Sequence, residues 1–112
     1  MNNEKLKNLP IYAIIQTIGG KYKILIISLL LEKKLRYSEI QKRIPCSSAK
    51  ILTQQLRELE TDGFINRKTY PVVPPKVEYS LTKFGQKLKP LIEMLDSLGI
   101  DYLHNMKQKN KD

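Results

Sequence analysis

The chain has 112 residues, of which 41% are hydrophobic, and this predicts one folded domain and excludes a disordered chain or a fibre. Twenty Lys and Arg residues against 11 Asp and Glu residues give a net charge of +9, which is typical of nucleic-acid binders, although membranes and acidic proteins also attract basic chains. No secretory signal opens the chain, its apolar runs are too short to span a membrane, and its one cysteine excludes an intrachain disulfide. We therefore expect a cytoplasmic protein without a membrane partner.

The first third of the chain predicts two helices. Residues 1–8 are polar and are expected to form a tail. Proline suits the first turn of a helix, so a short helix is predicted over Pro10–Ile18, ended by the glycines at 19–20. Residues 21–32 are apolar on almost every side and are expected to form the central helix of the core, followed by a charged connection at 33–36.

Two helices joined by a tight turn come next. The first spans about residues 38–44 and ends at a proline turn at 45–46, because proline cannot continue a helix. The hydroxyl of Ser47 or Ser48 is expected to cap the second helix by accepting a backbone N–H. That helix runs to residues 62–63, where an aspartate and a glycine end it.

The second helix of this pair has two distinct faces. Its apolar side chains recur at spacings of three and four and are expected to pack on the core: Ala49, Leu52, Leu56 and Leu59. The opposite face is polar and consists of Ser47, Lys50, Gln54 and Arg57, with Thr53 beside them. Arginine and lysine can donate to guanine and glutamine can pair with adenine, so this face is predicted to read DNA bases.

A solvated helix face would show the same polar residues, so the wider charge distribution decides between the two interpretations. Between Lys33 and Arg57 there are seven basic residues and one acid, Glu39, which concentrates positive charge on the proposed motif. The acids that follow are assigned to the end facing away from DNA, where they can pair with basic residues at the edge of the core: Glu58, Glu60 and Asp62.

A hairpin with a stiff tip follows. Residues 64–70 and 76–80 are rich in β-forming side chains, and the prolines between them prevent regular pairing at the tip. Three cations flank the tip and are expected to lie against the DNA backbone or minor groove: Arg67, Lys68 and Lys76. An ordinary edge hairpin whose lysines discourage aggregation is the alternative. The position directly after the reading helix favours a wing.

The last predicted helix covers residues 82–105, before a polar tail at 107–112. Its apolar side chains recur at steps of three and four, as in helices that pack on other helices: Phe84, Leu88, Leu91, Leu95, Leu98 and Tyr102. Packing on the same subunit's core accounts for part of this stripe, but about five turns exceed what one small core covers, so a homodimer is predicted. The predicted interface residues are Ile11, Ile14, Ile15, Leu88, Leu91, Ile92, Leu95, Leu98 and Tyr102.

The order of elements predicts a mostly helical α+β fold, a single winged helix-turn-helix domain over residues 1–112 with added N- and C-terminal dimerisation helices. Residues 9–99 resemble the HxlR-type winged-helix regulators. The most specific blocks are Leu-Thr-Gln-Gln-Leu-Arg-Glu-Leu-Glu from Leu52 and Val-Glu-Tyr-Ser-Leu-Thr from Val77. The resemblance implies a homodimeric repressor or activator whose second motif helix lies in the major groove with Lys50, Thr53, Gln54, Gln55 and Arg57.

Many members of that family sense oxidants, quinones or aldehydes through a cysteine just before the first helix, next to a proline. The matching position here is Leu9, before Pro10, so the comparison excludes thiol sensing at that place. Cys46 lies in the predicted turn instead. A nearby helix N-terminus can activate a thiol, but a small, inert turn residue is the favoured interpretation.

The sequence therefore predicts a homodimeric transcriptional regulator that binds a pseudo-palindromic double-stranded DNA operator, with repression favoured over activation. A basic winged-helix module that binds RNA or an acidic protein is the alternative. No enzyme, metal site or cofactor is predicted, because the glycines at 19–20 lack the spacing of a phosphate-binding loop and His104 has no companion ligand nearby; no effector is indicated. The residues predicted to contact DNA are Arg36, Ser47, Ser48, Lys50, Thr53, Gln54, Gln55, Arg57, Arg67, Lys68 and Lys76.

Overall fold

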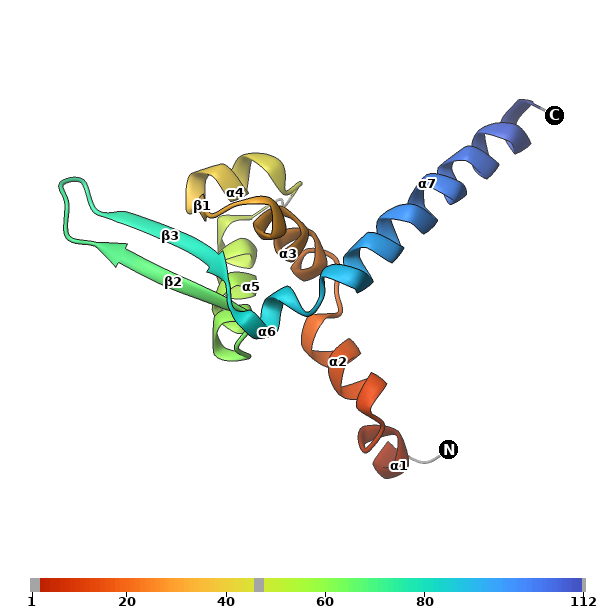
Figure 1. Cartoon of the computed structure of the whole chain (residues 1–112), viewed down its shortest axis with the longest axis horizontal. Coiled ribbons are helices and arrows are strands. Elements are labelled where there is room, and N and C mark those ends of the chain that lie inside the picture. Colours follow the sequence, from red (N-terminus) through yellow and green to blue (C-terminus); the bar gives the residue numbers. More distant parts are fainter. Residues whose placement is uncertain (1–2, 46–47, 112) are drawn as a thin grey trace.

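The computed structural model describes residues 3–45 and 48–111 (Figure 1). Its elements in chain order are α1 (Asn3–Lys7), α2 (Pro10–Ile18), α3 (Lys23–Glu32), β1 (Leu35–Arg36), α4 (Tyr37–Arg43), α5 (Ala49–Thr61), β2 (Ile65–Tyr70), β3 (Lys76–Leu81), α6 (Lys83–Gln86) and α7 (Lys89–Lys111). Helices α3, α4 and α5 form the centre, and the β2–β3 hairpin projects from it on the side away from α7 (Figure 1). The mostly helical α+β fold class is confirmed.

The core is built from apolar side chains that α3, α4, α5 and the sheet turn toward one another. Its buried members are Ile18, Ile26, Ile27, Leu30, Leu35, Ile40, Ile44, Leu52, Leu56, Leu59, Phe64, Ile65, Tyr79 and Leu88. The three α5 leucines among them are at most 1% exposed, and burying each contributes roughly 1.5–3 kcal/mol. One face of α5 is therefore fixed on the core, and the opposite face is left to solvent.

The sheet has three antiparallel strands in the order β1–β3–β2. β3 pairs with β2 from Ile65 opposite Leu81 outward, and with β1 at Leu35 opposite Tyr79. Strand β1 lies in the segment expected to be a charged connection, and that expectation is wrong. Two residues are too few to form an alternating pattern, so only the fold reveals that Leu35 is buried between charged neighbours.

The C-terminal helix expected over residues 82–105 is divided in two. α6 ends at Gln86, and α7 begins at Lys89 with Pro90 in its first turn. In one continuous helix the Pro90 ring would collide with the carbonyl of Gln86 and leave that carbonyl without its donor. The expectation of an uninterrupted helix is therefore wrong.

Both polar ends of the chain are helical where the structure describes them. Residues 3–7 form α1, and residues 107–111 continue α7, although both were expected to be tails. Lysine, glutamate and glutamine are good helix formers, so a polar composition does not by itself end a helix.

Helices α2 and α7 extend from the centre as two separate arms (Figure 1). The radius of gyration is 16.8 Å, against roughly 13 Å for a compact chain of this length. The radius of gyration is larger than for a compact chain because the two arms extend away from the centre. Over the described residues, no single helix is long and apolar enough to cross a membrane; α2 and α3 pass by length and composition only as a pair bent by 83°.

Candidate nucleic-acid interface

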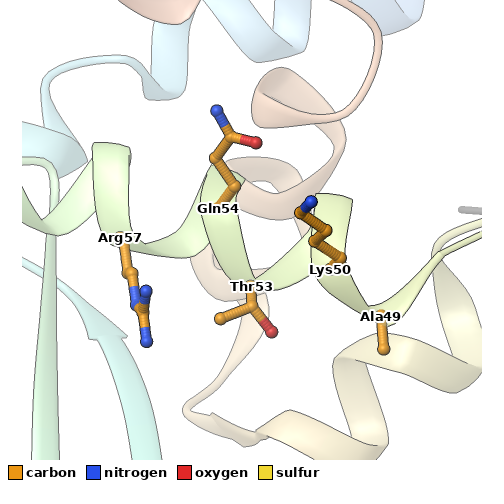
Figure 2. Close-up of a pocket in the computed structure, with 5 residues that line it drawn as sticks. All are labelled: Ala49, Lys50, Thr53, Gln54 and Arg57. Atoms are coloured by element: carbon orange, nitrogen blue, oxygen red, sulfur yellow. The ribbon is translucent and has the colours of Figure 1, made fainter.

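The exposed face of α5 brings together four residues predicted to contact DNA. A pocket of about 410 Å³ is lined by Ala49, Lys50, Thr53, Gln54 and Arg57 (Figure 2). The side chains of Lys50, Gln54 and Arg57 are exposed, and that of Thr53 is half-buried. Ala49 was expected to pack on the core, but it is exposed and lies on this outer face, so that expectation is wrong.

Two other predicted contacts on the motif lie elsewhere. The Ser48 hydroxyl accepts hydrogen bonds from the backbone N–H groups of Lys50 at 3.1 Å and Ile51 at 3.3 Å, so it caps α5. Gln55 lies roughly 200° around the helix axis from Thr53, outside the pocket. Ser47 and Cys46, also named as candidates, lie outside the described residues.

A hydroxyl chain joins the two helices of the motif. Thr53 Oγ1 donates to the Tyr37 hydroxyl at 3.3 Å, and Tyr37 donates to the backbone carbonyl of Ala49 at 3.2 Å. Tyr37 begins α4, so this chain holds α4 against α5 beside the polar face. No local pattern identifies Tyr37, because its partners are 12 and 16 residues away in the chain.

The acids of α5 pair with basic residues at the edge of the core. Glu58 Oε2 lies 2.6 Å from the ammonium of Lys23, and Glu60 Oε1 lies 3.5 Å from Arg67. The hydrogen bond from Lys23 lowers the pKa of the Glu58 carboxyl below its ordinary value of 4.5. Both carboxylates are thus neutralised locally, which reduces their repulsion of a nucleic acid at the adjacent face.

A third acid has a local structural role. Glu39 Oε1 accepts the backbone N–H of Arg36 at 3.0 Å, and this hydrogen bond lowers the pKa of the Glu39 carboxyl. It closes the first turn of α4. The single acid within the basic stretch therefore satisfies a helix terminus.

The predicted wing cations lie on two faces of the hairpin. Arg67 shares a face with its cross-strand partner Tyr79, next to α5. Lys68 and Lys76 lie on the other face, with their ammonium groups 4.9 and 4.8 Å from the ring centre of Tyr70. Their attraction to the ring orders both lysines at the base of the proline tip.

A second basic pocket lies where the wing meets α4. It measures about 340 Å³ and is lined by Arg36, Tyr37, Ser38, Pro75, Lys76 and Val77. Lys76 is 3.8 Å from Glu78, so part of its charge is balanced within the hairpin. The guanidinium, ammonium and hydroxyl groups gathered there are donors that suit a phosphate.

Exposed apolar side chains lie along one side of α7. Leu91, Leu95, Leu98 and Tyr102 are 40, 44, 56 and 62% exposed. At 100° per residue they fall within roughly 60° of the helix circumference, which makes one continuous stripe. On α2, Ile11 and Ile15 are also exposed; on α7, the predictions missed Met94, Ile100 and Met106.

Three residues predicted for a dimer interface are placed on the chain's own core. Leu88 belongs to the buried cluster, and Ile14 and Ile92 pack against it. Phe84, counted in the same stripe, lies in α6 and stacks on Phe64 with the ring centres 5.0 Å apart. The stripe therefore divides at the break before α7.

Among the described residues, no three His, Cys, Asp or Glu side chains are placed to hold a metal ion.

Comparisons of sequence agree on one family. The HxlR-like helix-turn-helix family matches residues 17–107 of the chain. The HTH-type transcriptional regulator YtcD of Bacillus subtilis is 43% identical over 103 residues, which are 92% of this chain and 82% of YtcD. An HTH-type transcriptional regulator of Methanothermobacter thermautotrophicus is 48% identical over 88 residues, which are 79% of this chain and 67% of the relative.

Solved structures with the same fold include two regulators. The crystal structure of the HTH-type transcriptional regulator YtcD matches with a TM-score of 0.80 at 44% identity, covering 86% of this chain and 98% of that one. The redox regulator HypR in its reduced form matches with a TM-score of 0.82 at 37% identity, covering 89% of this chain and 99% of that one. The winged-helix architecture predicted from the sequence is thereby confirmed.

Proposed function

Because the chain belongs to the HxlR-like helix-turn-helix family of transcriptional regulators, which are not enzymes, we propose that it binds a double-stranded DNA operator in a sequence-specific manner as a homodimer. The main observation in support of this proposal is the outer face of α5. Its leucines are buried, Lys50, Gln54 and Arg57 are exposed on its outer side, and the half-buried Thr53 lies beside them in the same pocket (Figure 2).

Each side chain on that face suits a particular contact in the major groove. Arg57 and Lys50 can donate to the O6 and N7 acceptors of guanine, and Gln54 can both donate to and accept from adenine. The Thr53 methyl group suits a thymine methyl. Each good bidentate pair contributes roughly 1–3 kcal/mol of discrimination between bases.

The wing and the α4 pocket supply contacts to the DNA backbone. Lys68 and Lys76 lie next to the tip of the hairpin, and Arg36 lines the same pocket as Lys76. Phosphate contacts fix the register of a reading helix without reading sequence. Arg67 is bound to Glu60 and faces α5, so we assign it to holding the wing against that helix.

The exposed stripe of α7, with Ile11 and Ile15 of α2, supplies the homodimer interface of this proposal. A two-fold axis there presents two α5 helices to half-sites about 34–36 Å apart, one turn of DNA, and calls for a pseudo-palindromic operator. A dimer bound at a promoter blocks RNA polymerase directly, so we favour repression over activation. We place the protein in the cytoplasm, where the DNA is accessible.

The test compares labelled duplex DNA, selected from a random pool, with a structured RNA over a series of salt concentrations. If the dimer neutralises roughly 8 to 10 phosphates, log affinity for the duplex falls with log salt at a slope of about −7 to −9. A flat salt response, or tighter binding to the RNA, contradicts the proposal.

We also propose that oxidation of a cysteine does not control the release of DNA by this protein. Leu9 occupies the place where the resemblance leads one to expect a cysteine, and we propose that the Cys46 thiol, which lies outside the described residues, does not act as a sensor. Treatment with an oxidant should change operator affinity equally little in the wild type and in Cys46→Ser. Oxidant-driven release in the wild type that Cys46→Ser abolishes would show that this assignment is wrong.

A further inference from the structure

The side chain of Lys23 is buried in the core, and its ammonium group is paired with a carboxylate of α5. The residue is 7% exposed, and a buried ammonium is unfavourable unless it is paired and hydrogen-bonded. Its Nζ lies 2.6 Å from Glu58 Oε2 and donates to the backbone carbonyl of Thr17 at 3.3 Å. The ammonium is held from two sides, by the last turn of α2 and by α5.

The other oxygen of Glu58 faces the outer surface of the reading helix. Gln54 Nε2 donates to Glu58 Oε1 at 3.2 Å. A carboxylate offers only acceptors, so the Gln54 amide has to turn its NH₂ group, and not its oxygen, toward Glu58. The chain Thr17, Lys23, Glu58, Gln54 therefore runs from the core to the pocket in Figure 2, where Gln54 is an outward-reaching side chain.

In this orientation, the groups of Gln54 that can pair with adenine remain available. One N–H is bound to Glu58, while the second N–H and the amide oxygen stay available. Adenine offers one acceptor, N7, and one donor, the N6 amino group, which match that pair. Guanine offers two acceptors and would leave the oxygen of Gln54 facing another oxygen.

We propose that Lys23 and Glu58 are positioning residues for base recognition, which fix the orientation of the Gln54 amide and so select adenine at the base pair opposite Gln54. The inference rests on the proposed DNA-binding function. Lys23 acts through Glu58, because its ammonium fixes the carboxylate and removes the negative charge that would otherwise stand beside the DNA.

The test uses selection of duplex DNA from a random pool by the full chain and by three variants. The wild type should select adenine at one position of each half-site, and Gln54→Ala should lose that preference by about tenfold. In Glu58→Gln the new amide keeps its oxygen toward Lys23 and turns its NH₂ toward Gln54. The Gln54 amide then loses its acceptor at residue 58 and turns its oxygen toward the new NH₂, which reverses the donor and acceptor that were placed for adenine, so the adenine preference at that same position should fall by about tenfold.

Glu60→Gln is the matched control. It removes one negative charge from the same helix, two residues further on, where Glu60 pairs with Arg67, and it should keep the adenine preference. Thermal unfolding of each variant confirms that it is folded. The proposal is overturned if Glu58→Gln still selects adenine there, or if it weakens binding evenly at every position. A wild type that selects no sequence at all overturns the proposed function itself, which is a distinguishable result.

Discussion

At the scale of single residues, the pair of Lys23 and Glu58 makes the stability of the fold depend on pH. The hydrogen bond from Lys23 lowers the pKa of the Glu58 carboxyl in the folded state below its ordinary value of 4.5. Folding then favours the ionised form, so the contribution is fully present above pH 4.5 and is lost as the pH falls through the lowered folded value.

We therefore expect the melting temperature of the wild type to fall on acidification below about pH 4.5, and to fall less for Glu58→Gln, which has no carboxyl to titrate. Melting curves followed by circular dichroism between pH 7 and pH 3 measure both proteins. Glu39, whose pKa is also lowered, remains in the variant, so some acid sensitivity stays. Identical acid sensitivity of the two proteins would contradict the role assigned to the pair.

The proposed division between base reading and backbone contact also belongs to this scale. Arg57→Ala should cost about 1–3 kcal/mol on the selected operator and little on unrelated DNA, because it removes a donor to a base. Lys76→Ala should weaken binding to all duplexes about equally and reduce the salt slope by about 1 for each lysine removed. Binding titrations on both duplexes measure this, and equal losses of specificity in the two variants would show the division to be wrong.

At the scale of elements, the start of α5 depends on one hydroxyl. Ser48→Ala leaves the backbone N–H groups of Lys50 and Ile51 without their acceptor and should lower the free energy of unfolding by about 1 kcal/mol. Ser97, exposed in the middle of α7, is the control, since Ser97→Ala should change it by a few tenths of a kcal/mol at most. Urea denaturation measures both, and equal effects would mean that Ser48 does not cap the helix.

The helices and the hairpin were predictable because their patterns are local. The spacing of Leu52, Leu56 and Leu59 identifies the buried side of α5, and the polar side follows by elimination. Ala49 was misplaced because alanine fits either side of a helix. The break at Pro90 was overlooked although its cause is local, while β1 was missed because two residues carry no period.

The candidate site was predictable in part for the same reason. Lys50, Thr53, Gln54 and Arg57 fall together because one helix carries them. The contacts of Lys23 with Glu58 and of Tyr37 with Thr53 join elements far apart in the chain, and no spacing rule reveals them. The same holds for Arg67, whose side of the sheet was set by a register known only from the fold.

At the scale of the whole molecule, the two arms expose large apolar side chains among the residues that the structure describes. Leu95→Glu places a charge within the α7 stripe and should convert a dimer to monomers, since a buried unpaired charge opposes association. Gln108→Glu adds the same charge roughly 140° further around the same helix and should stay dimeric. Sedimentation measures the mass of each variant, and a monomeric wild type would contradict the proposed interface.

The most direct test of the account is a footprint of the wild-type protein on an operator selected from random DNA. We predict protection of two inverted half-sites with centres about 34–36 Å apart, lost together when Leu95→Glu separates the subunits. Protection of one isolated half-site by a monomer, or protection without regard to sequence, would contradict the claim that this regulator binds DNA as a dimer through α5.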